Sequence, residues 1–130
     1  MKAWVCLLLA VLLLTACSPN QEPDREAVYM NITAKEAKEL MDTETGYIIL
    51  DVRTREEYDQ GHIPGAILIP DTEIRTEAEE ILTDKDRLIL VYCRSGRRSK
   101  LAAEILVELG YTNIKEFGGV IDWPYEVEYD

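Results

Sequence analysis

The stretch Arg87-Leu-Ile-Leu-Val-Tyr-Cys-Arg-Ser-Gly-Arg-Arg-Ser99 decides how this chain folds, because an apolar run passes directly into a basic, glycine-containing turn. A short apolar run bounded by polar residues is typical of a strand that is covered on both faces. From Leu101 the apolar residues follow helical spacing up to Gly110, which predicts a helix after the turn. Cys93 therefore stands at the carboxyl end of a buried strand, just before a helix.

The rest of the chain continues this alternation of strands and helices. Thr33 and Glu36 form a capping-box pattern that begins a helix ending before Gly46. The other predicted elements, in chain order, are a strand at 47–52, a short helix or turn at 53–58, a buried strand at 66–69, a helix capped by Asp71 that runs through Leu82, and a strand at 114–117. Such alternation implies parallel pairing in an α/β fold, with ligands at the carboxyl edge of the sheet.

Length and composition limit the classes of protein to consider. A chain of 130 residues has room for one domain, and 47% hydrophobic with 30% charged residues is the profile of a globular domain with a packed core. The formal net charge of −11 repels nucleic acids and anionic lipid surfaces, so we expect neither as a general partner. An anionic substrate remains compatible with this charge where positive side chains are concentrated locally.

The first residues are typical of an export signal rather than of a fold. Lys2 precedes the uncharged apolar run 3–14, which is shorter than the about 20 residues that a transmembrane helix needs. The run Leu14-Thr-Ala-Cys17 resembles the bacterial lipobox, in which the cysteine is acylated and becomes the new N-terminus. The alternative is an ordinary signal peptide with an incidental cysteine.

The lipobox divides the chain into three parts. We predict a lipoprotein signal peptide at residues 1–16, a lipidated Cys17 with a flexible tether over 17–28, and one folded domain over 29–130. The protein would be exported and held by this anchor alone on a bacterial membrane, either the cell membrane or the outer membrane, facing the periplasm or the exterior. Cys6 would leave with the signal peptide, so Cys93 would remain as the single thiol.

The loop after Cys93 is suited to stabilise a negative charge. Backbone N–H groups that wrap the start of a helix, together with the helix dipole, favour an anion at their centre. The next six residues supply positive charge, hydroxyl donors and a glycine that tolerates positive φ: Arg94, Ser95, Gly96, Arg97, Arg98 and Ser99. We expect the pKa of the Cys93 thiol to lie below its ordinary value, which makes the sulfur nucleophilic at neutral pH. The alternative, a structural cysteine among solvated arginines, leaves this cluster of arginines in an acidic chain unexplained.

Several separate segments resemble the rhodanese-like domain family. The loop matches the family's Cys-Arg-Ser-Gly-x-Arg-Ser pattern. A second pattern of the family is matched by three runs at the usual spacing: Asp51-Val-Arg53, Glu57-Tyr58 and Gly61-His-Ile-Pro-Gly-Ala66. Gly118-Gly119 followed by Trp123 matches its C-terminal end. The resemblance covers roughly residues 30–123 and implies an α/β fold with a five-stranded parallel sheet flanked by helices on both faces.

The resemblance also implies an activity. The family moves a sulfane sulfur from a donor such as thiosulfate to a thiophilic acceptor, and Cys93 would hold that sulfur as a persulfide until a low-molecular thiol, cyanide or a protein acceptor removes it. Arg94 and Arg97 would contact the sulfonate oxygens of the donor, whereas Arg98 would brace the loop. We expect no cofactor, and we expect the protein to act as a monomer.

Four polar residues of the second pattern are expected to support the scaffold rather than the chemistry: Asp51, Arg53, Glu57 and His62. Arg53 is expected to pair with Glu57 or with another carboxylate. A zinc site would lack ligands in a chain with one histidine and no second thiol in the domain, so no metal is expected.

Two other functions are compatible with parts of the pattern. Cysteine-based phosphatases use a Cys-x5-Arg loop, but the sixth residue after Cys93 is Ser99 and the last arginine is Arg98, so this loop is one residue too short. The residue before the cysteine is Tyr92 and not histidine, which further disfavours a phosphatase. A non-enzymatic sulfur carrier or protein-binding module is the other alternative. The intact cysteine and arginines favour an enzyme.

Overall fold

The computed structural model describes residues 28–129, so the predicted signal peptide, Cys17 and the tether up to residue 27 lie outside the described residues. The helices and strands are β1 Met30–Asn31, α1 Ala34–Thr43, β2 Ile48–Asp51, α2 Arg55–Asp59, β3 Ile67–Leu68, α3 Ile74–Ile81, β4 Ile89–Cys93, α4 Arg97–Glu108 and β5 Ile114–Gly119. Single 3-10 turns, η1 Asp71–Glu73 and η2 Val120–Asp122, precede α3 and follow β5. Between residues 28 and 129, no helix combines the length and the apolar character that crossing a bilayer requires.

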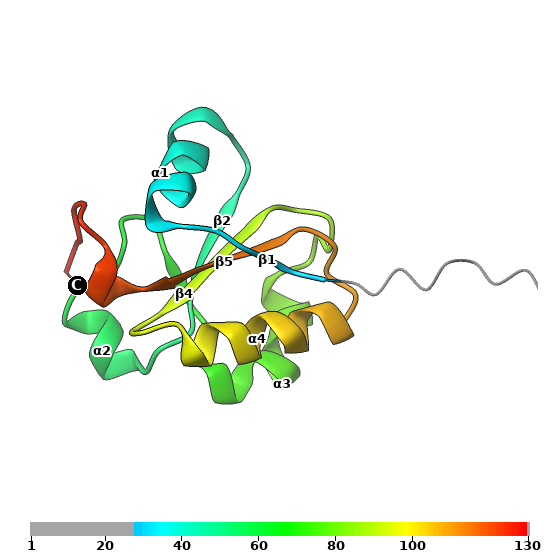
Figure 1. Cartoon of the computed structure of the whole chain (residues 1–130). Helices are drawn as coiled ribbons and strands as arrows, with labels where there is room; N and C mark the ends of the chain where they lie inside the picture. The colour runs from blue at the N-terminus through cyan, green and yellow to red at the C-terminus, as the bar shows by residue number, and fades with distance from the viewer. Residues whose placement is uncertain (1–27, 130) are drawn as a thin grey trace, which may run out of the picture.

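The five strands form one parallel sheet in the order β1-β5-β4-β2-β3. Helices α3 and α4 cover one face and α1 lies over the other (Figure 1). The predicted α/β fold with a five-stranded parallel sheet and helices on both faces is therefore confirmed. Because β2 and β4 are neighbours and run in the same direction, their last residues, Asp51 and Cys93, come to the same edge of the sheet.

Apolar side chains fill both sides of the sheet, which explains the unbroken apolar runs of the sequence. The cluster under α3 and α4 includes Leu50, Val91, Ala102, Ala103 and Leu106. The cluster on the α1 side includes Ala37, Ile49, Leu90, Tyr92, Phe117 and Trp123. Alternate residues of β4 thus enter opposite clusters, and all five residues of that strand are buried.

Local signals predicted some element boundaries well and others poorly. The capping box is confirmed, since Thr33 N–H donates to Glu36 Oε2 over 2.7 Å and Glu36 N–H donates to Thr33 Oγ1 over 3.1 Å. The buried strand predicted at 66–69 is wrong in extent: only β3 forms, and Ile67 is 37% exposed because β3 lies at the edge of the sheet. Asp71 does not cap the next helix, because it lies in the 3-10 turn η1 and α3 has no side-chain cap.

Candidate functional site

Cys93 ends β4, and its sulfur lies inside the turn that leads into α4. The residue is 1% exposed. Gly96 N–H donates to Cys93 Sγ over 3.0 Å, and the Ser99 hydroxyl oxygen lies 3.4 Å from the same sulfur. Gly96 adopts φ +104°, a conformation that side chains with a Cβ rarely reach, and this brings its amide back toward the strand. The turn therefore holds the sulfur among hydrogen-bond donors at the N-terminus of a helix.

These donors set the acidity of the Cys93 thiol. Burial raises its pKa, but hydrogen bonds from the Ser99 side chain and from the backbone N–H groups of Ser99, Gly96 and Ser95 outweigh burial, so the pKa lies below the ordinary value. The direction agrees with the sequence prediction. The backbone N–H groups and the hydroxyl donor that the sequence predicted are among its causes.

The three arginines of the loop occupy different environments. Arg94 and Arg97 are exposed. Arg98 is partly buried and forms a bidentate ion pair with Glu57 of α2, with distances of 2.8 Å from Nη2 to Oε2 and 3.2 Å from Nη1 to Oε1. This pair ties the first turn of α4 to α2. Arg53 was predicted to pair with Glu57 or with another carboxylate, and the second alternative holds, because Arg98 occupies Glu57.

Arg53 pairs with the other carboxylate, Asp51. Arg53 Nη2 lies 2.7 Å from Asp51 Oδ2 and also donates to the Gly61 carbonyl over 2.7 Å. The Tyr92 hydroxyl donates to Asp51 Oδ2 over 2.6 Å and accepts the Ile63 N–H over 3.1 Å. This buried network joins the end of β2, the turn at 61–63 and the residue that precedes Cys93.

His62 belongs to a neighbouring part of the scaffold. It is 1% exposed, and its ring stacks on Tyr58 with centroids 3.7 Å apart. Nδ1 lies 2.9 Å from the Tyr58 carbonyl oxygen and Nε2 lies 3.2 Å from Glu128 Oε1. These contacts hold the C-terminal segment against the turn. In the part of the chain that the structure describes, no three His, Cys, Asp or Glu side chains are grouped as metal ligands.

Glu116 is a residue of the site that sequence reasoning missed. It lies on β5 and is 2% exposed. Its Oε1 accepts hydrogen bonds from the Ser99 hydroxyl over 2.7 Å and from Gly118 N–H over 2.8 Å. One sequence signal could have found it: Glu116 stands two residues after the buried Ile114, so strand periodicity places both side chains on the same buried face.

The two glycines that end β5, Gly118 and Gly119, lie against the turn that carries Cys93. A Cβ on Gly119 would lie 1.9 Å from the Arg94 carbonyl oxygen and 2.5 Å from Ser95 N, so only glycine fits at this close approach. Gly118 is glycine for a different reason, its φ of +87°. In this motif, Gly118 is therefore required for its backbone conformation and Gly119 for the space that a Cβ would occupy.

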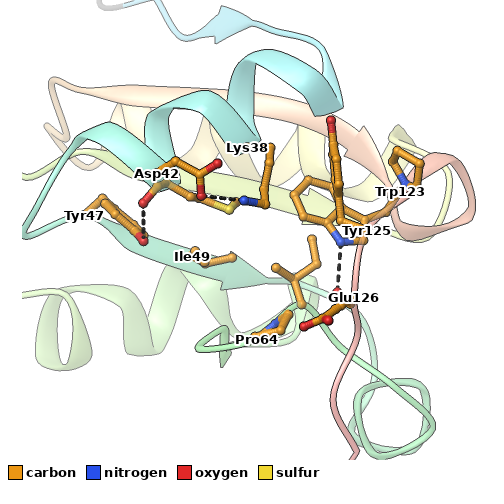
Figure 2. A pocket seen from close by; sticks show the side chains of 11 residues that line it. Lys38, Asp42, Tyr47, Ile49, Pro64, Trp123, Tyr125 and Glu126 are labelled. Carbon is orange, nitrogen blue, oxygen red and sulfur yellow. Dashed lines mark hydrogen bonds and ion pairs between the residues drawn. The ribbon is translucent and has the colours of Figure 1, made fainter.

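A separate groove of about 730 Å³ lies on the α1 face of the sheet. Figure 2 shows Lys38 and Asp42 of α1 on one side of it and Trp123, Tyr125 and Glu126 on the other. The Trp123 indole donates to the Glu126 carbonyl over 3.1 Å, which fixes one wall. No residue of the turn from Cys93 to Ser99 lines this groove, so it is distinct from the cysteine site.

Known proteins resemble this chain in sequence. The model of the rhodanese-like domain matches residues 33–123. Thiosulfate sulfurtransferase PspE of Escherichia coli (strain K12) is 44% identical over 73 residues, which are 56% of this chain and 70% of that protein. The putative sulfur carrier protein YrkF of Bacillus subtilis (strain 168) is 37% identical over 98 residues, which are 75% of this chain but only 52% of that longer protein.

Solved structures that resemble this chain are also rhodanese proteins. A rhodanese with anions from E. coli superposes with a TM-score of 0.61 at 38% identity, covering 65% of this chain and 99% of that one. A rhodanese-like domain protein from Staphylococcus aureus superposes with a TM-score of 0.67 at 31% identity, covering 78% of this chain and 98% of that one. The match of the family model over residues 33–123 and the parallel sheet that ends in the cysteine turn lead to one conclusion: the chain belongs to the rhodanese-like domain family.

Proposed function

We propose that this protein is a thiosulfate sulfurtransferase in which Cys93 carries sulfur as a persulfide. The observation that supports it most is the buried sulfur of Cys93 with Gly96 N–H at 3.0 Å and the Ser99 hydroxyl at 3.4 Å, at the start of α4. Donors that stabilise a thiolate also stabilise a persulfide anion. Sulfur transfer is the reaction named for relatives in this family, among them a thiosulfate sulfurtransferase and a sulfurtransferase of Allochromatium vinosum.

The first half of the reaction loads the cysteine. The Cys93 thiolate attacks the outer, sulfane sulfur of thiosulfate, so a bond forms between Sγ and that sulfur. The bond between the sulfane sulfur and the sulfonate sulfur breaks, and its electron pair leaves with sulfite. The persulfide that remains is anionic and lies where the N–H groups of the turn can donate to it.

The second half returns the cysteine. Cyanide or a thiolate attacks the outer sulfur of the persulfide, forms a new bond to it and releases Cys93 as a thiolate. A thiol whose pKa is lowered is a better leaving group in such an exchange. The hydrogen bonds that lower the pKa of Cys93 therefore assist both halves of the cycle.

The donor's sulfonate oxygens are assigned to Arg94 and Arg97, whose exposed side chains flank the turn. Arg98 is engaged by Glu57 and holds α4 in place. The charge of −11 repels an anionic donor over the whole surface, but salt screens exposed charges beyond about 8 Å. Contact with two guanidinium groups outweighs that distant repulsion.

The full chain with thiosulfate tests this proposal. Mass spectrometry of the peptide Leu88–Arg94 should show one added sulfur atom on Cys93, sulfite should appear in solution, and cyanide should remove the sulfur again. Cys93→Ser should show none of these changes while it unfolds at the wild-type temperature. Turnover by a well-folded Cys93→Ser protein would contradict the mechanism. A persulfide that forms but that cyanide and small thiols leave in place would instead favour a carrier that serves a protein acceptor.

We also propose that the protein is exported and anchored through a lipid on Cys17. This rests on the run Leu14-Thr-Ala-Cys17, because two acyl chains hold a protein on a membrane where one does not. Wild-type protein should fractionate with membranes and incorporate labelled fatty acid, and Cys17→Ala should abolish both. Membrane association without the label would show that the lipobox interpretation is wrong.

A further inference from the structure

The proposed reaction leaves one buried carboxylate beside the cysteine without a role. Glu116 is 2% exposed, and its Oε1 accepts hydrogen bonds from Ser99 and from Gly118 N–H. None of the ion pairs found between residues 28 and 129 includes Glu116. Burying a carboxylate against neutral donors is costly, so its place beside the turn requires an explanation.

The Ser99 hydroxyl stands between Glu116 and Cys93. Its oxygen lies 2.7 Å from Glu116 Oε1 and 3.4 Å from Cys93 Sγ, and the carbonyls of Gly96 and Gly118 are farther than the carboxylate at 3.0 and 3.4 Å. A hydroxyl carries one proton and donates it to one acceptor at a time. The charged and nearest acceptor, Glu116, takes that hydrogen bond. A lone pair of the Ser99 oxygen is then free to accept the Cys93 S–H.

We propose that Glu116 accepts the thiol proton of Cys93 through the Ser99 hydroxyl. The Cys93 proton passes to Ser99 Oγ as the Ser99 proton passes to Glu116 Oε1, so one S–H bond breaks, one O–H bond forms on Glu116 and the net charge is unchanged. The Ser99 hydroxyl then donates to the thiolate, and protonated Glu116 donates to the Ser99 oxygen. The reverse transfer returns the proton when Cys93 leaves as a thiolate.

Glu116 touches no reacting atom in this scheme, so it is a positioning residue that acts through Ser99. The inference rests on the proposed function for the step that it serves. The ionisable groups beside Glu116 are Cys93 from β4, which Ser99 links to it, and Tyr29 before β1, which is also near Glu104 of α4. Burial, Glu104 and Glu116 together raise the pKa of Tyr29, so this residue stays neutral and contributes no charge. Two negative charges on either side of one hydroxyl repel each other, so the ionisation of both groups at once is disfavoured.

The pH dependence of Cys93 alkylation tests this coupling. Iodoacetamide is neutral and consumes the thiolate without any sulfur donor, and its reaction in the full chain can be followed on the peptide Leu88–Arg94 from about pH 5 to 9. In the wild-type protein the rate should change much less than tenfold per pH unit over part of this range. An internal proton acceptor supplies a fraction of thiolate that does not depend on pH.

Glu116→Gln keeps an acceptor oxygen for Ser99 and Gly118 but cannot take up the proton. Its rate should change about tenfold per pH unit below a single midpoint, as for one isolated thiol. Below that midpoint it should react at least as fast as wild type at every pH, because a neutral amide no longer opposes the thiolate. Its midpoint should lie at lower pH than the upper midpoint of wild type, because the thiolate no longer faces a carboxylate. A merely structural role would lower the rate equally at every pH.

Two further variants complete the test. Ser99→Ala interrupts the path while it leaves Glu116 in place, so it should also lose the shallow region. Glu104→Gln removes an exposed carboxylate near the same tyrosine and should keep the wild-type profile. Identical profiles for wild type and Glu116→Gln would overturn the inference. A wild-type alkylation rate that changes tenfold per pH unit below a single midpoint would also overturn it, even if Glu116→Gln fails to fold. If the wild-type alkylation rate depends only weakly on pH but thiosulfate loads no sulfur on Cys93, the proton path is supported and the proposed donor is rejected.

Discussion

Replacing Gly119 by alanine tests whether the close approach of Gly119 to the backbone of Arg94 and Ser95 is needed. The backbone of Gly119 is extended, with φ −129° and ψ 153°, so alanine adopts it without strain. The added Cβ would lie 1.9 Å from the Arg94 carbonyl oxygen and 2.3 Å from its carbonyl carbon. Any effect of Gly119→Ala therefore comes from this collision with the backbone of the turn.

The size of the effect follows from the distances. Ordinary van der Waals contact begins at 3.4 Å, so the Arg94 carbonyl and the new Cβ must separate by 3.4 − 1.9 = 1.5 Å. Overpacking of this kind costs about 1–3 kcal/mol of stability. The displaced segment adjoins Gly96, whose N–H lies 3.0 Å from Cys93 Sγ. A misplacement of about 1 Å at a reacting centre lowers rates on the order of 100-fold.

Three measurements on Gly119→Ala check this reasoning. Denaturant unfolding should show the loss of stability, alkylation of Cys93 should need higher pH, and sulfur loading from thiosulfate should slow. Gly118→Ala is the matched control, because a Cβ there meets nothing within 4 Å and the penalty comes only from its φ of +87°, about 1–2 kcal/mol. Wild-type stability together with wild-type loading in Gly119→Ala would refute the steric argument.

Three other perturbations have expected outcomes. Asp51→Asn should lower the free energy of unfolding by about 3–5 kcal/mol in urea titrations, because it leaves the buried Arg53 without its charged partner; a loss below about 1 kcal/mol would contradict this. Arg94→Ala and Arg97→Ala should each raise the half-saturating thiosulfate concentration at least about tenfold with unchanged melting temperature, as expected for a lost hydrogen bond to a charged group; unchanged kinetics in both would remove these side chains from the donor site. The pKa of Cys93 is lower in the folded chain than in the unfolded chain, so the stability of wild type relative to Cys93→Ala should be full above the unfolded-state pKa and should fall as the pH drops through the folded-state pKa; a difference that grows toward acid pH in parallel melting curves would reverse the sign of the shift.

Local sequence signals predicted the elements that local interactions determine. The capping box of α1 needs only Thr33 and Glu36, and both hydrogen bonds form. The strand that ends at Cys93 and the helix that starts after Gly96 were predictable because an apolar run and helical spacing meet within a few residues. Each of these signals lies within one element or one turn, where the spacing of residues fixes their distance.

Partners that are distant in sequence were predicted less well. The sequence predicted that Arg53 pairs with Glu57 or with another carboxylate and did not choose between them. In the structure Arg53 turns inward to Asp51, and Glu57 pairs with Arg98, which is 41 residues away. The choice depends on how α2 packs against α4, and no pattern within either helix reports it. The same limit applies to the edge strand β3, whose exposure depends on its having one neighbour.

The pairing of β4 with β5 explains why the contacts of Glu116 and Gly119 with the cysteine turn cannot be read from either strand alone. Val91 lies opposite Glu116, but Cys93 lies opposite Gly119, so two steps along β4 match three steps along β5. The extra residue falls at the bulge, where Gly118 adopts positive φ and its N–H donates to Glu116 over 2.8 Å. Because of this irregularity, β5 places the Glu116 carboxylate against the Ser99 hydroxyl and also places Gly119, which has no side chain, against the backbone of Arg94. The chemistry proposed for Cys93 therefore depends on a register shift between two strands as much as on the turn that carries the cysteine.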